Sequence, residues 1–394
     1  MLYMQPELNP FVPGSGLRPP ALVGRDDEIA AFDLTIEKTL ARHLSRGIIL
    51  HGLRGVGKTV LLNNFREQAE KADWFVVELE GRSTEAGEFG VRHKLGRAFL
   101  TSASKASRSK KATEALKAAL GTVKSFSVSL GVVAVEIGID ANRGRGDSGQ
   151  IEIDLEELLE DLAPVLKEQS RAIGIFIDEM QDLDNDLLVA LLSAQHRAGQ
   201  KGWPFFIVGA GLPDLPATLS SAKSYAERLF DYRRVGALNP ASARAALEDP
   251  VRAYGATYEP DALDALLEAA AGYPYFLQTF GRSAWDAATG RLITAEDAEA
   301  AITVGHDELD MGFYPARWDR VSPAERRYLR AMAENDDESR KSVDVVEALG
   351  STLTKQSMVR QTLIEKGIIY APERGFVAFT VPGMASYIRR QYPD

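Results

Sequence analysis

The stretch GLRGVGKT at residues 52–59 constrains the fold of this chain more than any other part of its sequence. Three glycines within six residues would weaken a strand or a helix, because glycine loses the most backbone entropy on folding. An apolar run at residues 47–50 precedes the stretch, and apolar residues at helical spacing follow it. A strand, a glycine-rich loop and a helix in this order are typical of a P-loop, whose backbone N–H groups surround a phosphate chain.

The pattern G-x-x-x-x-G-K-[ST] gives its residues distinct roles. We expect Lys58 to reach the β- and γ-phosphates of a nucleotide and to support catalysis there, and Thr59 to bind Mg²⁺. The predicted nucleotide-binding residues of this segment are Gly52, Gly55, Val56, Gly57, Lys58, Thr59 and Val60.

A second motif, IGIFIDE at residues 173–179, is an apolar strand that ends in two carboxylates. On a parallel sheet both would lie at the carboxyl end of the strand, where ligands bind in such folds. We expect Asp178 to hold the Mg²⁺ ion and Glu179 to polarise the attacking water.

Strand-like and helical segments alternate along the chain, which predicts an α/β fold of the P-loop NTPase type, with a parallel sheet covered by helices on both faces. Residues 101–150 differ from their surroundings and suggest an insertion, with a β-hairpin about Gly131 and a flexible tail. The predicted domains are an extended N-terminal lead-in (1–22), a nucleotide-binding domain (23–235, with the insertion at about 101–150), a helical lid (236–312) and a winged-helix domain (316–394).

Composition limits the possible chemistry. The 394 residues include no cysteine, which excludes disulfides, thiolate zinc sites and catalytic cysteine, and the five histidines show no ligand spacing. Neither a membrane-spanning run nor an N-terminal leader is present in the sequence, so we expect a cytoplasmic protein that does not bind membranes. The net charge of −10 gives no general attraction to nucleic acid, and any such contact requires a local basic patch.

The last eighty or so residues read as three helices followed by a β-hairpin, the order of a winged helix. On the third helix, Lys355, Gln356 and Arg360 would face DNA, and Arg374 at the tip of the wing would reach a phosphate. Residues 316–394 hold 13 Arg or Lys and 11 Asp or Glu residues, a small excess for a region that binds a polyanion. Duplex DNA and a protein partner therefore both remain open as ligands.

Together, GLRGVGKT, FIDEMQDL, the earlier LVGRDDE and the later GYPYFLQ resemble the AAA+/STAND class of ATPases, especially its initiator and archaeal-type branch. The resemblance covers residues 22–310, and the winged helix extends it. It implies that Val23, Gly24 and Arg25 lie against the adenine, and that Pro274 packs near the base and reports its presence through the lid.

The chain also departs from that class. The strand FFIVGAG ends in Gly209, Ala210 and Gly211, where the class usually has a polar sensor of the γ-phosphate. The lid lacks the usual sensor arginine, for which Arg282 is a candidate substitute. The resemblance makes Arg228 the candidate arginine finger acting on a neighbouring subunit, with Arg233 and Arg234 behind it, although a solvent-exposed helix arginine fits the same position.

These features predict an ATP- and Mg²⁺-dependent ATPase, slow without assembly, that acts as a nucleotide-driven switch and associates with double-stranded DNA. Its ligands would be ATP and ADP, and ATP binding would favour a homo-oligomer. The alternative is a signalling or adaptor ATPase that hydrolyses ATP poorly and docks a protein partner through its winged helix.

Overall fold

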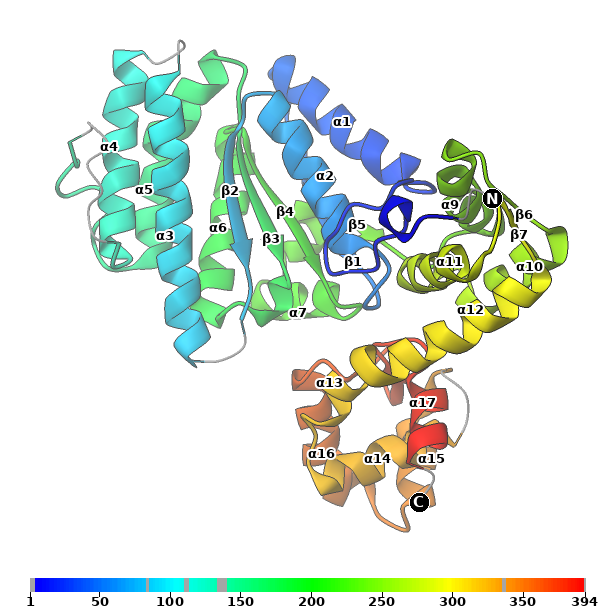
Figure 1. The fold of residues 1–394 in the computed structure, drawn as a ribbon. Helices are drawn as coiled ribbons and strands as arrows, with labels where there is room; N and C mark the ends of the chain where they lie inside the picture. The colour runs from blue at the N-terminus through cyan, green and yellow to red at the C-terminus, as the bar shows by residue number, and fades with distance from the viewer. Residues whose placement is uncertain (1–3, 83–84, 110–112, 133–139, 335–337, 393–394) are drawn as a thin grey trace.

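The computed structural model describes residues 4–82, 85–109, 113–132, 140–334 and 338–392. A central sheet with its helices, a helical lid and a C-terminal unit of small helices follow one another along the chain (Figure 1). In the described part of the chain, no helix is both long enough and apolar enough to cross a bilayer.

The central sheet is five-stranded and wholly parallel, in the order β2-β3-β4-β1-β5. This arrangement confirms the predicted P-loop NTPase fold. Because β1 and β3 both flank β4, the P-loop after β1 and the carboxylates after β3 reach the same edge of the sheet. The strands are β1 (Gly47–His51), β2 (Phe75–Glu80), β3 (Ile173–Asp178), β4 (Phe205–Gly211) and β5 (Phe230–Arg234).

Helices cover both faces of the sheet (Figure 1). Ile48 and Leu50 point to the face that packs against α1 and α2, whereas Ile49 points to the opposite core. This alternation is the period-two pattern of a strand buried on both sides. The helices are α1 (Asp26–Leu40) and α2 (Lys58–Lys71) on one face, and α3 (Glu85–Arg108), α4 (Glu114–Ser129), α5 (Ile151–Glu168), α6 (Asn185–Lys201), α7 (Leu215–Ala222) and α8 (Ala226–Leu229) on the other or at its edge.

The predicted hairpin about Gly131 is wrong where the structure describes it, because residues 126–129 belong to α4. Thr113 caps this helix by accepting a hydrogen bond from the Leu116 N–H group, and its buried residues recur at helical spacing. The rest of the predicted hairpin, residues 133–139, lies outside the described residues. The predicted start of the insertion at residue 101 falls inside α3, which continues through it to Arg108.

The segment predicted as a flexible tail is bonded to α5. Asp154, buried in the first turn of that helix, accepts a hydrogen bond of 2.7 Å from the Ser148 backbone N–H group. Arg145 pairs with Asp161 at 2.6 Å. Three glycines of this segment adopt positive φ, and the loop folds back over the helix that follows it.

The lid and the C-terminal unit share one hydrophobic core, which continues from α9–α12 through Tyr314 and Trp318 into the last helices. The lid consists of α9 (Pro240–Ala253), β6 (Thr257–Tyr258), α10 (Pro260–Ala270), α11 (Pro274–Ala287), β7 (Leu292–Ile293) and α12 (Ala295–Glu308). In Figure 1, α12 leads directly from the lid into the C-terminal unit.

Among its described residues, the C-terminal unit at 309–392 contains the three helices and the two strands predicted for it, together with a further strand, β8, the further helices α13 and α17, and the π-helical turn η3. Its strands form an antiparallel sheet in the order β8-β10-β9. The elements are η3 (Leu309–Phe313), α13 (Pro315–Trp318), α14 (Pro323–Ala333), β8 (Arg340–Lys341), α15 (Ser342–Ala348), α16 (Leu353–Glu365), β9 (Ile369–Tyr370), β10 (Phe376–Phe379) and α17 (Met384–Gln391).

Candidate nucleotide site

The P-loop joins β1 to α2, which begins at Lys58. Gly57, just before this helix, has φ of 92°, a backbone conformation that residues other than glycine rarely adopt. Gly52 packs so closely on Val235 that a Cβ atom there would overlap its carbonyl oxygen. Glycine at these two positions therefore lets the loop turn tightly at the N-terminus of α2, where backbone N–H groups can bind an anion.

Thr59 and Asp178, predicted to share a metal ion, lie together. The Thr59 hydroxyl donates a hydrogen bond of 2.8 Å to one carboxylate oxygen of Asp178. Burial raises the pKa of Asp178, and the bond from Thr59 opposes that shift. The described residues hold no cluster of three or more His, Asp or Glu side chains able to hold a metal by itself. Two hard oxygen donors beside a phosphate cradle suit Mg²⁺, which keeps water and phosphate oxygens as its other ligands.

Lys58 is buried and lies at the centre of the loop. Its ammonium group donates hydrogen bonds to the carbonyl oxygens of Gly52, at 2.9 Å, and Leu53, at 2.8 Å. Burial lowers the pKa of Lys58 to about 8, while Glu179 opposes that shift. A buried cation held only by carbonyl dipoles is poised to accept an anion, because a phosphate oxygen would compensate its charge better.

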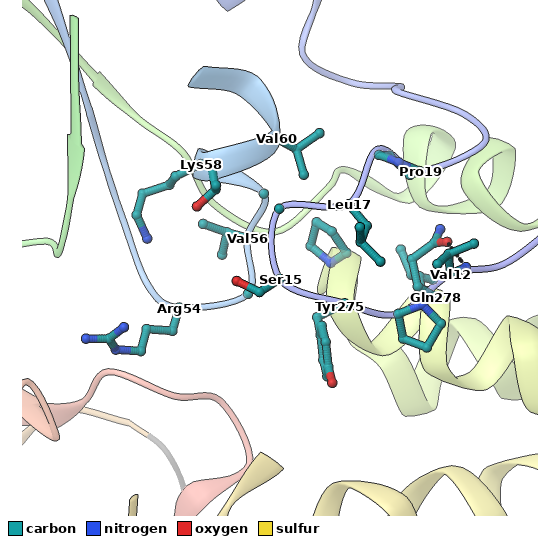
Figure 2. Close-up of a pocket in the computed structure, with 18 of the residues that line it drawn as sticks. Val12, Ser15, Leu17, Pro19, Arg54, Val56, Lys58, Val60, Tyr275 and Gln278 are labelled. Atoms are coloured by element: carbon teal, nitrogen blue, oxygen red, sulfur yellow. Dashed lines mark hydrogen bonds between the residues drawn. The ribbon is translucent and has the colours of Figure 1, made fainter. Parts of the chain in front are cut away.

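A cavity of about 330 Å³ lies beside the loop, between the sheet domain and the lid (Figure 2). Among the residues placed near the base by resemblance, Val23, Arg25 and Pro274 line this cavity, whereas Gly24 does not. The buried Arg25 guanidinium donates hydrogen bonds to the carbonyl oxygens of Val56, at 3.0 Å, and Gly236, at 2.6 Å. Arg25 therefore connects the loop to the start of the lid.

The N-terminal strap, residues 4–22, also lines the cavity, which the sequence did not predict. Phe11 is buried against Gly281 of the lid, and the Val12 N–H group donates a hydrogen bond of 3.3 Å to Gln278. The strap then crosses in front of the P-loop, where Ser15 and Leu17 lie in Figure 2. A lead-in without helical or strand periodicity gave no signal of this contact, which depends on partners more than two hundred residues away.

Glu179 follows Asp178 and has both carboxylate oxygens engaged. Arg54 of the P-loop donates to one oxygen at 2.7 Å, and the Gln181 amide donates to the other at 2.7 Å. The Leu212 N–H group donates in turn to the Gln181 side-chain oxygen at 3.1 Å. Burial acts to raise the pKa of Glu179, but Arg54 and the other donors outweigh it and lower the pKa.

The end of β4 offers no polar side chain, as its glycines indicated. A Cβ atom at Gly211 would overlap the side-chain oxygen of Gln181, and one at Gly209 would lie 2.6 Å from the sulfur of Met180. Gln181 thus places an amide group where a side chain from β4 would otherwise stand. The glycines make room for this group.

Two arginines assigned by resemblance lie outside this cavity. Arg282 pairs with Glu308 of α12 and does not line this cavity. Arg228 is exposed on α8 and precedes β5, whose first residue pairs with Gly47 at the amino end of β1. It therefore lies at the opposite edge of the sheet from its own P-loop. Arg233, further along β5, pairs with Asp231.

An arginine missed by the sequence analysis, Arg317 of α13, does line the cavity. Its guanidinium lies 4.5 Å from the centre of the Phe313 ring and donates a hydrogen bond to the Phe313 carbonyl. Burial and the nearby charge of Arg54 lower the pKa of Arg317 to about 10. The C-terminal unit therefore contributes a cation to the nucleotide site.

Of the four residues predicted to face DNA, three are on α16 and Arg374 is in the turn between β9 and β10. Lys355 is exposed on α16, and Gln356 donates a hydrogen bond of 3.1 Å to Ser351. Arg360 and Arg374 line a groove between α16 and the β9–β10 turn. Among the described residues, the Nε atom of Arg360 is buried without a hydrogen-bond partner.

The parallel sheet, the glycine loop and the Thr59–Asp178 pair define a P-loop nucleotide-binding protein. Residues 21–208 match the family model of the AAA ATPase domain, and residues 311–388 match a domain of unknown function, DUF8462. The chain therefore contains an AAA-type P-loop ATPase domain.

Several solved structures align with nearly the whole chain at low sequence identity. The Walker-type ATPase PABY2304 of Pyrococcus abyssi is 15% identical, covers 97% of this chain and 99% of its own, and has a TM-score of 0.59. The RuvB Holliday junction branch migration motor of Thermotoga maritima is 15% identical, with 92% and 96% covered and a TM-score of 0.45. The ORC2 protein of Aeropyrum pernix is 13% identical, with 97% and 98% covered and a TM-score of 0.45. No curated protein matched the sequence.

Proposed function

We propose that this ATPase is a nucleotide-driven switch in which the C-terminal unit responds to the state of the P-loop. The observation that carries the proposal is a direct contact between the two. The Arg54 N–H group, inside the P-loop, donates a hydrogen bond of 3.0 Å to the carbonyl oxygen of Thr380 in the C-terminal unit. A phosphate chain in the cradle would compete for the same stretch of backbone.

The residues of the site support hydrolysis of ATP with Mg²⁺. Lys58 would exchange its carbonyl partners for phosphate oxygens, and Thr59 and Asp178 would hold the ion. The ion would supply positive charge that stabilises the transferred phosphate. Glu179 would accept a proton from the attacking water once its oxygens are free.

The exposed Arg228 supports a role as an arginine finger acting in trans. Because it lies at the far edge of the sheet from its own P-loop, a role in hydrolysis would require it to act on the cavity of a neighbouring subunit. Fingers of this kind accelerate phosphoryl transfer by roughly 10³–10⁵. An isolated chain is therefore expected to hydrolyse ATP slowly, and ATP binding is expected to favour assembly.

We further propose that the C-terminal unit is a winged helix that contacts duplex DNA through Lys355, Gln356, Arg360 and Arg374. The order of its helices and antiparallel strands supports this assignment, and so does the groove that holds Arg360 and Arg374. A protein partner is the second candidate, because Met358 is 79% exposed and Leu353 is 51% exposed on the same helix. Large exposed apolar side chains are typical of a protein interface.

The switch can be tested with two fluorescent labels, since the natural chain has no cysteine to interfere. The substitutions Ser224→Cys, in the sheet domain, and Ser357→Cys, on α16, introduce the two labelling sites at exposed positions. We expect energy transfer between the labels to differ between ADP and a non-hydrolysable ATP analogue, and Lys58→Ala to abolish the difference. Equal transfer in both nucleotides, with nucleotide binding verified, would contradict the switch.

A further inference from the structure

Arg54 occupies a variable position of the P-loop, yet its side chain contacts the residue assigned as general base. The guanidinium donates to Glu179 at 2.7 Å, and the two side chains are 28% and 27% exposed. Figure 2 shows Arg54 extending from the loop on the side away from the strap residue Ser15. The two side chains come from different strand ends of the sheet, so the pair crosses the mouth of the phosphate cradle.

With this contact, each carboxylate oxygen of Glu179 accepts a hydrogen bond from a side chain. Gln181 holds the second oxygen, and the Leu212 N–H group fixes the Gln181 amide in turn. A carboxylate accepts a proton from water only when one of its oxygens is within hydrogen-bond reach of that water. The observed arrangement directs one oxygen to Arg54 and the other to Gln181, and we interpret it as a resting position of the base.

The C-terminal unit fixes Arg54 from the other side. Thr380, which accepts the Arg54 N–H bond, is fully buried, and its hydroxyl donates to the Gly367 carbonyl at 2.7 Å. A Cβ atom at Gly367 would lie 3.2 Å from a terminal nitrogen of Arg54 and 3.1 Å from Leu212. Thr380 thus holds the backbone of Arg54 by a hydrogen bond, and a methyl group added at Gly367 would press on the Arg54 guanidinium.

We propose that Arg54 is a positioning residue that holds Glu179 in this resting arrangement, and that the docked C-terminal unit keeps Arg54 there. Release of the C-terminal unit frees Arg54 to leave Glu179, and the base then reaches water. The inference rests on the proposed function, because it requires Glu179 to be the base. It adds a residue of the P-loop itself and the contact that controls it.

The first test compares Arg54→Met and Arg54→Lys with the natural chain in steady-state ATP hydrolysis and in equilibrium binding of a fluorescent ATP analogue. We expect Arg54→Met to raise kcat about fivefold, because the interaction energy of a partly exposed ion pair corresponds to about that factor in rate. The dissociation constant of the ATP analogue should change by less than about threefold. Arg54→Lys, which keeps a cation able to pair with Glu179, should return kcat toward the natural value. A kcat that is unchanged or lower in Arg54→Met, or a loss of nucleotide binding, would overturn the proposal.

The contact with the C-terminal unit is tested by a matched pair of glycines. Gly367 and Gly350 have φ of 62° and 57°, so alanine strains the backbone similarly at both, but a Cβ atom at Gly350 would meet nothing within 4 Å. We expect Gly367→Ala to raise kcat and Gly350→Ala to leave it unchanged at a similar loss in Tm. Adding Gly367→Ala to Arg54→Met should give no further rise, since both act on one contact. Equal kcat in the two glycine variants, or effects that multiply, would contradict the coupling.

Failure of this inference can be told apart from failure of the proposed function. Glu179→Gln and the double variant Glu179→Gln with Arg54→Met should both be inactive if Glu179 is the base. If either one hydrolyses ATP at the natural rate, the proposed base is wrong. If both are inactive while Arg54→Met alone shows no gain, only the role of Arg54 is wrong.

Discussion

Tyr275 of the lid donates its backbone N–H to the carbonyl oxygen of Gly55 in the P-loop, at 3.2 Å. The first turn of α11 therefore touches the phosphate loop directly, and Pro274 beside it lines the cavity. Strand β3, the lid and the C-terminal unit all contact the P-loop motif, at Thr59, Gly55 and Arg54 respectively.

We expect the P-loop to bind the nucleotide and the end of β3 to support hydrolysis, and one substitution in each distinguishes these roles. Lys58→Ala should weaken nucleotide binding, because it removes the buried cation of the cradle. Glu179→Gln should leave binding intact and lower turnover by about 10²–10⁴, the usual contribution of a positioned base. Binding of a fluorescent ATP analogue and release of phosphate measure the two effects. Equal turnover in Glu179→Gln and the natural chain would exclude Glu179 as the base.

The strap should hold the nucleotide through Phe11. Phe11→Ala removes a buried ring from the lid core, at a cost of about 3–5 kcal/mol in unfolding free energy, and loosens the cavity wall. If the adenine base of the nucleotide loses about 50 Å² of apolar cover, the nucleotide should bind about eightfold more weakly. Leu8→Ala, at an exposed position of the strap, is the control and should bind normally. Unchanged affinity in Phe11→Ala would show that the strap does not contribute to binding.

Arg228 should act across a subunit boundary. Arg228→Ala and Glu179→Gln should each be inactive, and their mixture should recover part of the hydrolysis, because some interfaces then pair an intact finger with an intact base. Arg197→Ala, which removes an exposed arginine paired with Glu156, serves as the control and should hydrolyse normally. A mixture that stays inactive would argue against an arginine finger acting in trans. Normal hydrolysis by Arg228→Ala would show that Arg228 is a surface arginine without a role in hydrolysis.

The C-terminal unit should bind duplex DNA in a salt-dependent way. If Lys355, Arg360 and Arg374 each neutralise one phosphate, the log–log slope of affinity against salt should be about −2.7 per protomer. Alanine at all three should remove most of this slope and leave nucleotide binding intact. The control replaces three exposed cations of the sheet domain, Arg46, Lys71 and Lys201.

Fluorescence anisotropy of a labelled duplex, with ATP analogue, with ADP and without nucleotide, gives the readout for DNA. We expect binding to be strongest where ATP drives assembly, because several weak units then act together. No binding in any state, at low salt and micromolar protein, would favour the protein partner instead.

Glu325 should stabilise the C-terminal unit in a pH-dependent way. Its carboxylate accepts hydrogen bonds from Lys366, at 2.8 and 2.9 Å, and from the Ser322 N–H group, at 2.6 Å. Burial acts to raise the pKa of Glu325, but these bonds outweigh it and lower the pKa. The charged form therefore stabilises the fold above the unfolded pKa of about 4.3, and this contribution disappears as the pH falls through the lower folded value.

Urea unfolding of Glu325→Gln at pH 7 and pH 4 tests this dependence. At pH 7 the variant should lose about 1–3 kcal/mol of unfolding free energy, and the loss should shrink at pH 4. Glu365→Gln, at an exposed position of α16, is the control and should unfold like the natural chain at both values. A loss that is the same at both pH values would show that charge is not its cause.

Local patterns predicted the P-loop, the strands around it and the meeting of Thr59 with Asp178, because a parallel sheet brings the ends of its strands to one edge. The prediction of a hairpin about Gly131 was wrong for a local reason. The alternation in FSVS fits a strand, but the residues before it repeat at helical spacing, and α3 and α5 offer that helix a face on each side.

The remaining contacts depend on tertiary structure alone. Arg54 pairs with Glu179 across 125 positions of sequence, and Asn9 of the strap bonds to Arg282 of the lid across 273. Arg282 itself had the right residue type for a sensor, but Glu308 on the neighbouring helix holds it. Arg317 takes its place in the cavity because α13 folds back from the lid, which no periodicity in the sequence reports.

The core shared by the lid and the C-terminal unit has a mechanical consequence. Apolar side chains packed without interruption transmit displacement, since a packed interior resists compression. Phe11 anchors the strap in the same core, so strap, lid and C-terminal unit amount to a single lever. The chain enters this lever between β5 and α9, at Gly236, where a Cβ atom would meet nothing within 4 Å, and this is where we expect its pivot. A small rotation there, set by the length of the phosphate chain, would be magnified along the lever into a far larger excursion of α16 at its tip.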